Sequence, residues 1–185
     1  MVVENFIRSG GMSARHLFEF QREIDTRFVH GDLHSRNLLI DPASHELVAI
    51  DYANSAQDHV VKDFAKLEID SIYSVLDAEG GTETSWVSMN RWQRVLASYG
   101  PDATLEQKMD IENESLASAI AGIRDACHQT SPRVSIDEYL MASLFFTLRV
   151  LAYPDIALPK KGLAVQCAGA IVNSLEARLA ASAGN

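Results

Sequence analysis

The segment that most constrains the fold of this chain is residues 58–77, where apolar residues occupy most of the circumference of one predicted helix. A helix that is apolar around so much of its surface is usually buried among other elements. Its apolar side chains are Phe64, Leu67, Ile69, Ile72, Tyr73, Val75 and Leu76. A single polar row remains, made of Asp63, Lys66, Asp70, Ser74 and Asp77. We therefore predict a central helix that other elements cover on several sides.

The rest of the chain is mostly helical in pattern, because apolar residues recur every three or four positions. The segments with this spacing are 13–26, 84–99, 104–128, 135–152 and 160–181. Residues 38–50 differ, because two short apolar runs flank a stretch, 41–45, with the composition of a turn. The sequence thus predicts an α+β, mainly helical fold with one small β-hairpin. We expect residues 1–12 to be a linker or the end of an upstream region, and residues 13–185 to form one lobe.

Composition narrows the possible partners. The 185 residues are 47% hydrophobic, which excludes a disordered chain and suffices for one sizeable core. The net charge of −9, from 25 acidic and 16 basic residues, argues against a nucleic-acid-coating surface. The most apolar run, residues 139–148, is shorter than the about 20 residues that span a membrane. No basic segment precedes an apolar stretch at the N-terminus, so we expect a cytoplasmic protein with neither nucleic-acid nor membrane partners.

Hard oxygen groups gather between His30 and Asn37 and again at Asp51. Because an antiparallel hairpin brings its outer ends together, Asn37 and Asp51 should be neighbours in space. A carboxylate beside an amide oxygen suits Mg²⁺, which takes few protein ligands and completes its shell with water and substrate phosphate. A further carboxylate, Asp32, can take the proton of a hydroxyl. Such a set of residues suits phosphoryl transfer to an alcohol.

The sequence His30-Gly31-Asp32-Leu33-His34-Ser35-Arg36-Asn37, followed by Ile50-Asp51-Tyr52, resembles a known signature. It is similar to the HGDLHxxN…IDY/F pattern of the aminoglycoside phosphotransferase and choline kinase superfamily, which has the protein-kinase-like fold. The spacing also matches the catalytic loop of protein kinases, H-R-D-L-x-x-x-N. Residues 59–68, HVVKDFAKLE, look like the D-x-A element of that superfamily, and their KLE ending is also similar to kinase-like domains of multidomain bacterial conflict or signalling proteins.

The resemblance covers about residues 28–70 and implies the C-terminal lobe of an ATP- and Mg²⁺-dependent phosphotransferase. Asp32 would be the base that orients the acceptor hydroxyl. His34 and Arg36 would place positive charge near the transferring phosphoryl group, where it stabilises the transition state. An equally open alternative for Arg36 is a structural ion pair with a neighbouring carboxylate.

The same resemblance assigns supporting roles to four other residues. Asn37 and Asp51 would hold Mg²⁺. His30 would pack beneath the loop rather than react. Asp63, on the predicted central helix, would hold the loop from below, whereas its neighbours Lys66 and Asp70 have the spacing of a local charge ladder.

Residues 1–27 offer no place for the Gly-rich phosphate loop, or for the strand Lys with its helix Glu, of a kinase upper lobe. We therefore expect this chain alone to be inactive without an N-terminal lobe. Two other functions stay open: a non-catalytic kinase-fold interaction domain of a larger signalling or conflict-system protein, and a metal-dependent hydrolase using the same carboxylates. A zinc site is disfavoured, because His30 and His34 lie on a loop without a third ligand in pattern.

Overall fold

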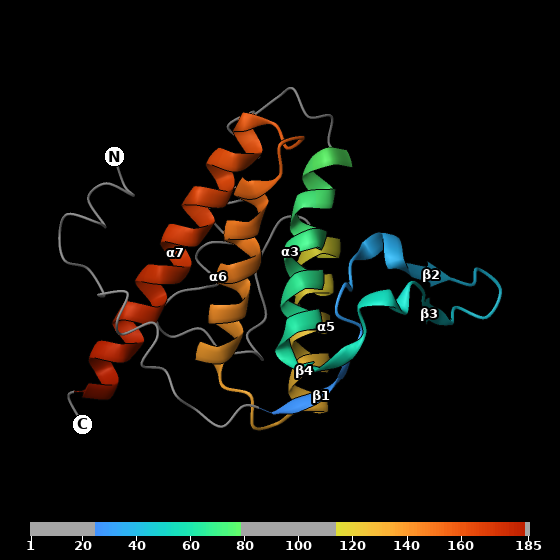
Figure 1. The fold of residues 1–185 in the computed structure, drawn as a ribbon, viewed down its shortest axis with the longest axis horizontal. Coiled ribbons are helices and arrows are strands. Elements are labelled where there is room, and N and C mark those ends of the chain that lie inside the picture. The colour runs from blue at the N-terminus through green and yellow to red at the C-terminus, as the bar shows by residue number, and fades with distance from the viewer. Residues whose placement is uncertain (1–24, 79–113, 184–185) are drawn as a thin grey trace.

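The computed structural model describes residues 25–78 and 114–183, which form four α-helices and two small antiparallel sheets (Figure 1). The helices are α3 (Val61–Ala78), α5 (Glu114–Thr130), α6 (Ile136–Ala152) and α7 (Leu158–Ala183). The α+β, mainly helical class is thus confirmed for these residues. The expected linker at 1–12, the predicted helix at 84–99 and most of the one at 13–26 lie outside the described residues.

Helix α3 is central, as its apolar circumference predicts. It packs against α5 and α6, and α7 packs against the other side of α6 (Figure 1). Ala65, Ile69 and Ile72 of α3 are buried in the single core cluster that these helices share. The other helices contribute the side chains that the three-to-four spacing singled out, among them Ile120, Leu140, Leu144, Cys167, Ile171 and Leu175. Both cysteines, Cys127 and Cys167, are buried free thiols.

A fully buried ion pair joins three of the helices. Glu68 of α3 accepts two hydrogen bonds from Arg124 of α5, from Nε at 2.9 Å and from Nη2 at 2.6 Å. The hydroxyl of Tyr139, on α6, donates to the same carboxylate at 2.6 Å. All three side chains are at most 1% exposed. Burial of charge is costly unless hydrogen bonds compensate it, so this network admits few other placements of the three helices.

Local signals explain where two helices begin. The Ser135 hydroxyl accepts a hydrogen bond from the Glu138 backbone at 3.2 Å, and the Glu138 carboxylate accepts one from the Ser135 backbone at 2.7 Å. This capping box satisfies backbone donors that a helix start leaves unpaired, so α6 begins at Ile136. Pro159 lies in the first turn of α7, where its missing N–H costs nothing. In the described residues, no helix is both long and apolar enough to cross a membrane.

The first sheet pairs β1 (Thr26–Val29) with β4 (Ala56–His59), in the antiparallel register Thr26 with His59 and Val29 with Ala56. The sequence pattern predicts Thr26 at the end of one helix and Asp58 and His59 at the start of the next, and both boundaries are wrong, because these residues lie in β1 and β4. Cross-strand pairing of the backbone overrides the weak helical pattern at these ends. Helix α3 begins only after the strand, where His59 Nδ1 accepts the Val61 N–H at 3.3 Å.

The second sheet is the predicted hairpin, formed by β2 (Leu38–Ile40) and β3 (Leu47–Ala49) in the register Leu38 with Ala49. Asp41 organises the turn: its carboxylate accepts hydrogen bonds from the Ala43 N–H at 2.8 Å and the Ser44 hydroxyl at 2.9 Å. An aspartate that bonds the backbone two residues on is typical of such a turn. In Figure 1 the hairpin projects from the helices on the side of α3 away from α7.

The buried ion pair generates the first prediction. Replacement of Arg124 by Met removes both guanidinium hydrogen bonds from the buried Glu68 carboxylate and should lower the free energy of unfolding by about 3–5 kcal/mol. Urea denaturation followed by circular dichroism measures the change. The double variant Glu68→Leu with Arg124→Met should recover much of the loss, and Arg133→Met, at an exposed position, serves as the control. A loss below about 1 kcal/mol in the single variant would contradict this account.

Candidate functional site

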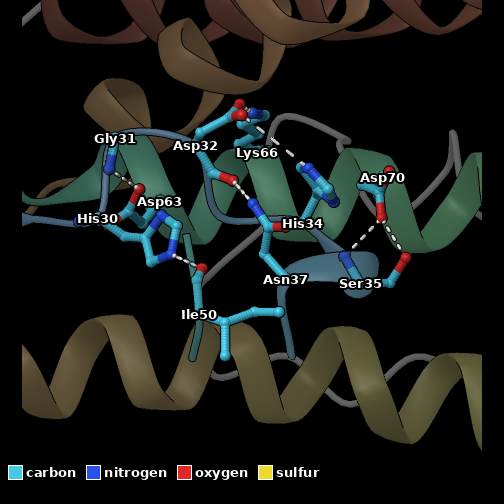
Figure 2. Close-up of polar contacts among 10 residues, drawn as sticks. All are labelled: His30, Gly31, Asp32, His34, Ser35, Asn37, Ile50, Asp63, Lys66 and Asp70. Carbon is cyan, nitrogen blue, oxygen red and sulfur yellow. Dashed lines mark hydrogen bonds and ion pairs between the residues drawn. The ribbon is translucent and has the colours of Figure 1, made fainter. Parts of the chain in front are cut away.

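The loop from His30 to Asn37 connects β1 to β2 and lies along the polar row of α3 (Figure 2). The Asp63 carboxylate accepts the backbone N–H of His30 at 2.5 Å and that of Gly31 at 2.9 Å. Asp63 is only 8% exposed, so these two bonds form where water competes little. Asp63 thus contacts the start of the loop, at the place where the family resemblance expects it.

The next two members of the row also hold the loop. The Lys66 ammonium contacts the Asp32 carboxylate, and the Asp70 carboxylate accepts both the backbone N–H and the hydroxyl of Ser35, at 2.8 and 2.6 Å. The local charge ladder expected for Lys66 and Asp70 is thus not their whole role, because both also contact the loop. Residues three, four and seven apart share a helix face, and here that face meets a polar loop instead of solvent.

Gly31 is required by the packing of this loop. Its φ of +82° lies in the left-handed region, which favours glycine. A Cβ at this position would meet the carbonyl oxygen of Asn54 at 2.1 Å. Asn54 belongs to η2 (Tyr52–Asn54), a short 3₁₀ turn that follows the hairpin. The loop and the chain leaving the hairpin are thus in backbone contact.

His30 is buried beneath the loop, which agrees with its expected structural role. Its Nε2 donates to the carbonyl oxygen of Ile50 at 2.7 Å, because a carbonyl oxygen can only accept a hydrogen bond. The ring also contacts that of Tyr52, with centroids 4.7 Å apart. The Ser55 hydroxyl donates to the His30 carbonyl at 3.2 Å. These contacts join the start of the loop to the chain that leaves the hairpin.

Asn37 and Asp51 lie at the two outer ends of the hairpin, as predicted from its topology. The Ile50 N–H donates to the Asn37 carbonyl oxygen at 2.9 Å, which continues the ladder one step beyond the paired strands. Asn37 is buried, and its Nδ2 donates to the Asp32 carbonyl oxygen at 3.1 Å. Asp51, which follows Ile50, has a backbone in the left-handed region with φ of 63°.

Asn37 and Asp51 bring to this end of the hairpin the kinds of oxygen donor that Mg²⁺ binds. Within residues 25–78 and 114–183, neither Asn37 Oδ1 nor the Asp51 carboxylate accepts a hydrogen bond, so both oxygens are available as ligands. Two protein oxygens suit Mg²⁺, which usually retains several waters and binds substrate phosphate. The same residues contain no group of three His, Cys, Asp or Glu side chains able to hold a metal ion.

The side chains of the expected catalytic residues Asp32, His34 and Arg36 line a pocket of about 390 Å³. His34 Nε2 lies 4.0 Å from Asp32 Oδ2, which is close enough for an ion pair when the imidazole is protonated. No carboxylate of the described residues pairs with Arg36, so the alternative of a structural ion pair finds no support there. The pocket size is within the range of small-molecule sites.

Sequence reasoning missed the opposite wall of this pocket. That wall comes from α3 and from the C-terminal end of α6, through Lys66, Phe146, Arg149 and Tyr153. Desolvation, with the nearby Arg149 guanidinium, holds the pKa of Lys66 below its ordinary value. The amphipathic spacing of 135–152 located the helix, but only the tertiary packing shows that its last turns face the loop.

The double hydrogen bond to Asp63 generates the second prediction. In Asp63→Asn the side-chain amide keeps one oxygen that can accept a hydrogen bond, but its NH₂ group faces the second backbone N–H. The free energy of unfolding should therefore fall by about 1.5–3 kcal/mol. Hydrogen exchange should quicken at the amides of His30 and Gly31. Asp58→Asn, which affects a partly exposed pair with Lys62 away from the loop, is the matched control and should leave both amides protected. Unchanged exchange at these amides in Asp63→Asn would show that the carboxylate does not hold the loop.

The chain was also compared with known proteins. The sequence pattern of one family, described as ternary complex associated domain 9, matches residues 2–152. No curated protein and no solved structure matches the chain. The match spans most of the sequence and includes the loop, the hairpin, α3 and α6. The chain therefore belongs to the ternary complex associated domain 9 family.

Proposed function

We propose that this domain is the C-terminal lobe of a protein-kinase-like phosphotransferase related to the aminoglycoside phosphotransferases. The observation that carries the proposal is the placement of Asp32 at a pocket by a loop that α3 holds at three points, through Asp63, Lys66 and Asp70. Phosphoryl transfer depends chiefly on positioning and charge, so a fixed loop is what the reaction requires. The cytoplasm, where ATP is abundant, is the fitting location.

In the proposed reaction, the acceptor hydroxyl binds in the pocket beside Asp32. Its oxygen forms a bond to the γ-phosphorus of ATP, the bond from that phosphorus to the bridging oxygen of ADP breaks, and the hydroxyl proton passes to the Asp32 carboxylate. In the structure, the Lys66 ammonium contacts the Asp32 carboxylate. For the substrate to bind productively, Asp32 must give up this contact and accept a hydrogen bond from the acceptor hydroxyl in its place.

Two neighbouring cations serve the transferred group. Arg36 lines the pocket without a carboxylate partner in the described residues, and His34 lies within ion-pair distance of Asp32. Positive charge aimed at the oxygens of the transferring phosphoryl group stabilises the charge that they carry in the transition state. Arg36 is permanently charged, whereas His34 contributes charge only when it is protonated.

Asn37 and Asp51 are the residues that would hold Mg²⁺ in this proposal. The bound ion would neutralise charge on the ATP phosphates. The contribution of the protein is to hold the two oxygens in place: Asn37 through its hydrogen bond to the Asp32 carbonyl, and Asp51 through the hairpin ladder at Ile50.

The metal proposal is tested by paramagnetic broadening. Millimolar Mn²⁺, a spectroscopic stand-in for Mg²⁺, should broaden the NMR signals of Asn37 and Asp51 before those of the exposed Asp41 and the partly exposed Asp58. Binding should be weak without nucleotide, because the phosphates that complete the metal shell are missing. The double variant Asn37→Ala with Asp51→Asn should abolish the effect. Broadening confined to other carboxylates would remove the site from the proposal.

The transfer reaction itself is tested with Asp32→Asn. We expect the 185-residue chain to show no ATP-dependent phosphorylation of aminoglycosides, choline or protein hydroxyls, because residues 1–27 hold no Gly-rich loop to cover the phosphates. Joined to an upstream nucleotide-binding lobe from its parent gene, the chain should become active. Asp32→Asn should then abolish turnover, and Asp58→Asn should leave it unchanged. Turnover by the 185 residues alone that disappears in Asp32→Asn would contradict the requirement for another lobe.

A non-catalytic interaction domain is the second candidate, and two observations favour it. The family description refers to a ternary complex. The hairpin also carries large apolar side chains that are half or more exposed, namely Leu39, Ile40, Leu47 and Val48. Exposed apolar patches of this kind often mark interaction sites. Absence of turnover even in the full-length parent, with this domain folded, would favour this second function.

A further inference from the structure

The pocket beside Asp32 is also lined by charged side chains that the proposed reaction does not use, among them Arg149 near the C-terminal end of α6. Arg149 lines the pocket, and its guanidinium lies 5.8 Å from the centre of the Tyr153 ring. Lys66 lines the same pocket from α3, with a side chain only 14% exposed. Among the described residues, no carboxylate forms an ion pair with Arg149. Together with Arg36, three basic side chains thus line this pocket, and Lys66 and Arg149 are the two that come from α3 and α6.

We propose that this pocket binds the anionic group, a carboxylate or a phosphate, of a small hydroxyl-bearing molecule between Lys66 and Arg149. The inference rests on the proposed phosphotransferase function and specifies its acceptor. The hydroxyl of that acceptor lies at Asp32, and its negative charge lies toward α6. The acceptor class is therefore a hydroxy acid or a phosphorylated alcohol, in contrast to a cationic sugar or amine.

The balance of charges supports an anion at this position. Burial and the nearby Arg149 guanidinium lower the pKa of Lys66, and Asp70 acts in the opposite direction. Lys66 and Arg149 therefore repel each other across the pocket that both line. An anion between them replaces repulsion with two attractive contacts. The acidic groups of the pocket are Asp32, Asp70 and Asp155. Asp32 contacts Lys66, and Asp70 accepts two hydrogen bonds from Ser35, which leaves Asp155 as the anionic side chain without a described contact.

Anion binding also gives the Lys66 contact a role in the reaction. Lys66 has one ammonium group, which the Asp32 carboxylate engages in the structure described. A substrate anion at Arg149 competes with Asp32 for this ammonium. As Lys66 turns to the substrate, Asp32 becomes free to accept the hydroxyl proton. In this proposal, the anionic group by which the pocket recognises its acceptor therefore also frees the Asp32 carboxylate from Lys66.

The size and lining of the pocket limit the acceptor further. A volume of about 390 Å³ fits a small molecule. The apolar part of the wall comes from Ile69, Phe146, Val150 and Ile156. These side chains provide a surface for a short carbon skeleton between the anionic group and the hydroxyl.

Binding without ATP or Mg²⁺ tests the proposal independently of catalysis. Four probes are titrated into the ¹⁵N-labelled chain and followed by NMR: glycerate, glycerol 3-phosphate, neutral glycerol and cationic choline. Glycerate or glycerol 3-phosphate should shift the signals of Lys66, Arg149 and Tyr153, and the stronger of the two identifies the anion. Glycerol and choline should bind at least about tenfold more weakly. Choline binding as tightly as both anions would overturn the proposal.

Matched variants at one wall of the pocket locate the interaction. Arg149→Gln should weaken binding of the preferred anion about tenfold or more, and Arg149→Lys should retain part of it. Asp155→Asn removes charge of the opposite sign from the same pocket and should leave binding equal or tighter. Unchanged binding of the anion in Arg149→Gln would overturn the proposal. Loss of anion binding on addition of a non-hydrolysable ATP analogue would also overturn it, because Lys66 and Arg149 would then bind the nucleotide.

Asp32→Asn separates this inference from the proposed function. The variant removes the competitor of the substrate anion for Lys66, so it should bind the anion as tightly as the unaltered chain or more tightly. In the active, full-length context the same variant should have no transfer activity. Anion binding without transfer in the unaltered parent would contradict the phosphotransferase proposal alone. Transfer to neutral or cationic acceptors only, without anion binding, would contradict the present inference alone.

Discussion

The position of α3 depends on the buried ion pair between Glu68 and Arg124, and the rest of the structure depends on α3. Glu68 emerges from one side of the helix and is held by α5 and by Tyr139 of α6. Asp63, Lys66 and Asp70 emerge toward the loop. A buried charged pair tolerates little displacement, because loss of its geometry leaves a charge without compensation. The pair therefore fixes the rotation of α3 about its axis, and that rotation determines where the loop lies.

This arrangement gives the loop a rigid support although the loop itself is short and largely irregular. The Asp63 carboxylate holds the loop backbone at residues 30 and 31. The Asp70 carboxylate, about two turns further along α3, holds it at residue 35. Sites built on regular elements hold their geometry better than sites on unsupported loops. In this domain helix α3 fixes the position of the loop, and the loop carries the polar side chains that line the pocket, Asp32, His34 and Arg36.

The sequence predicted the elements with a strong periodicity and the contacts that follow from chain topology. It located the central helix, the three described C-terminal helices and the hairpin, whose ends meet at Asn37 and Ile50. The contact of Asp63 with the loop followed from the family resemblance. The β1–β4 pairing was missed, because four-residue strands with mixed polarity have no pattern of their own. The positions of Lys66 and Arg149 at the pocket were missed because they depend on long-range packing between α3, α6 and the loop, which local spacing does not encode.

The backbone contact between Gly31 and Asn54 makes position 31 a diagnostic of the site in related sequences. Any side chain there displaces the 3₁₀ turn that begins directly after Asp51, because the obstructing atom is a main-chain oxygen and has no rotamer to change. Displacement of that turn shifts Asp51, which directly precedes it. Under the proposed function, a family member with another residue at the position of Gly31 would hold this part of the chain differently, even where Asn37 and Asp51 persist. Position 31 then distinguishes family members although it performs no chemistry itself.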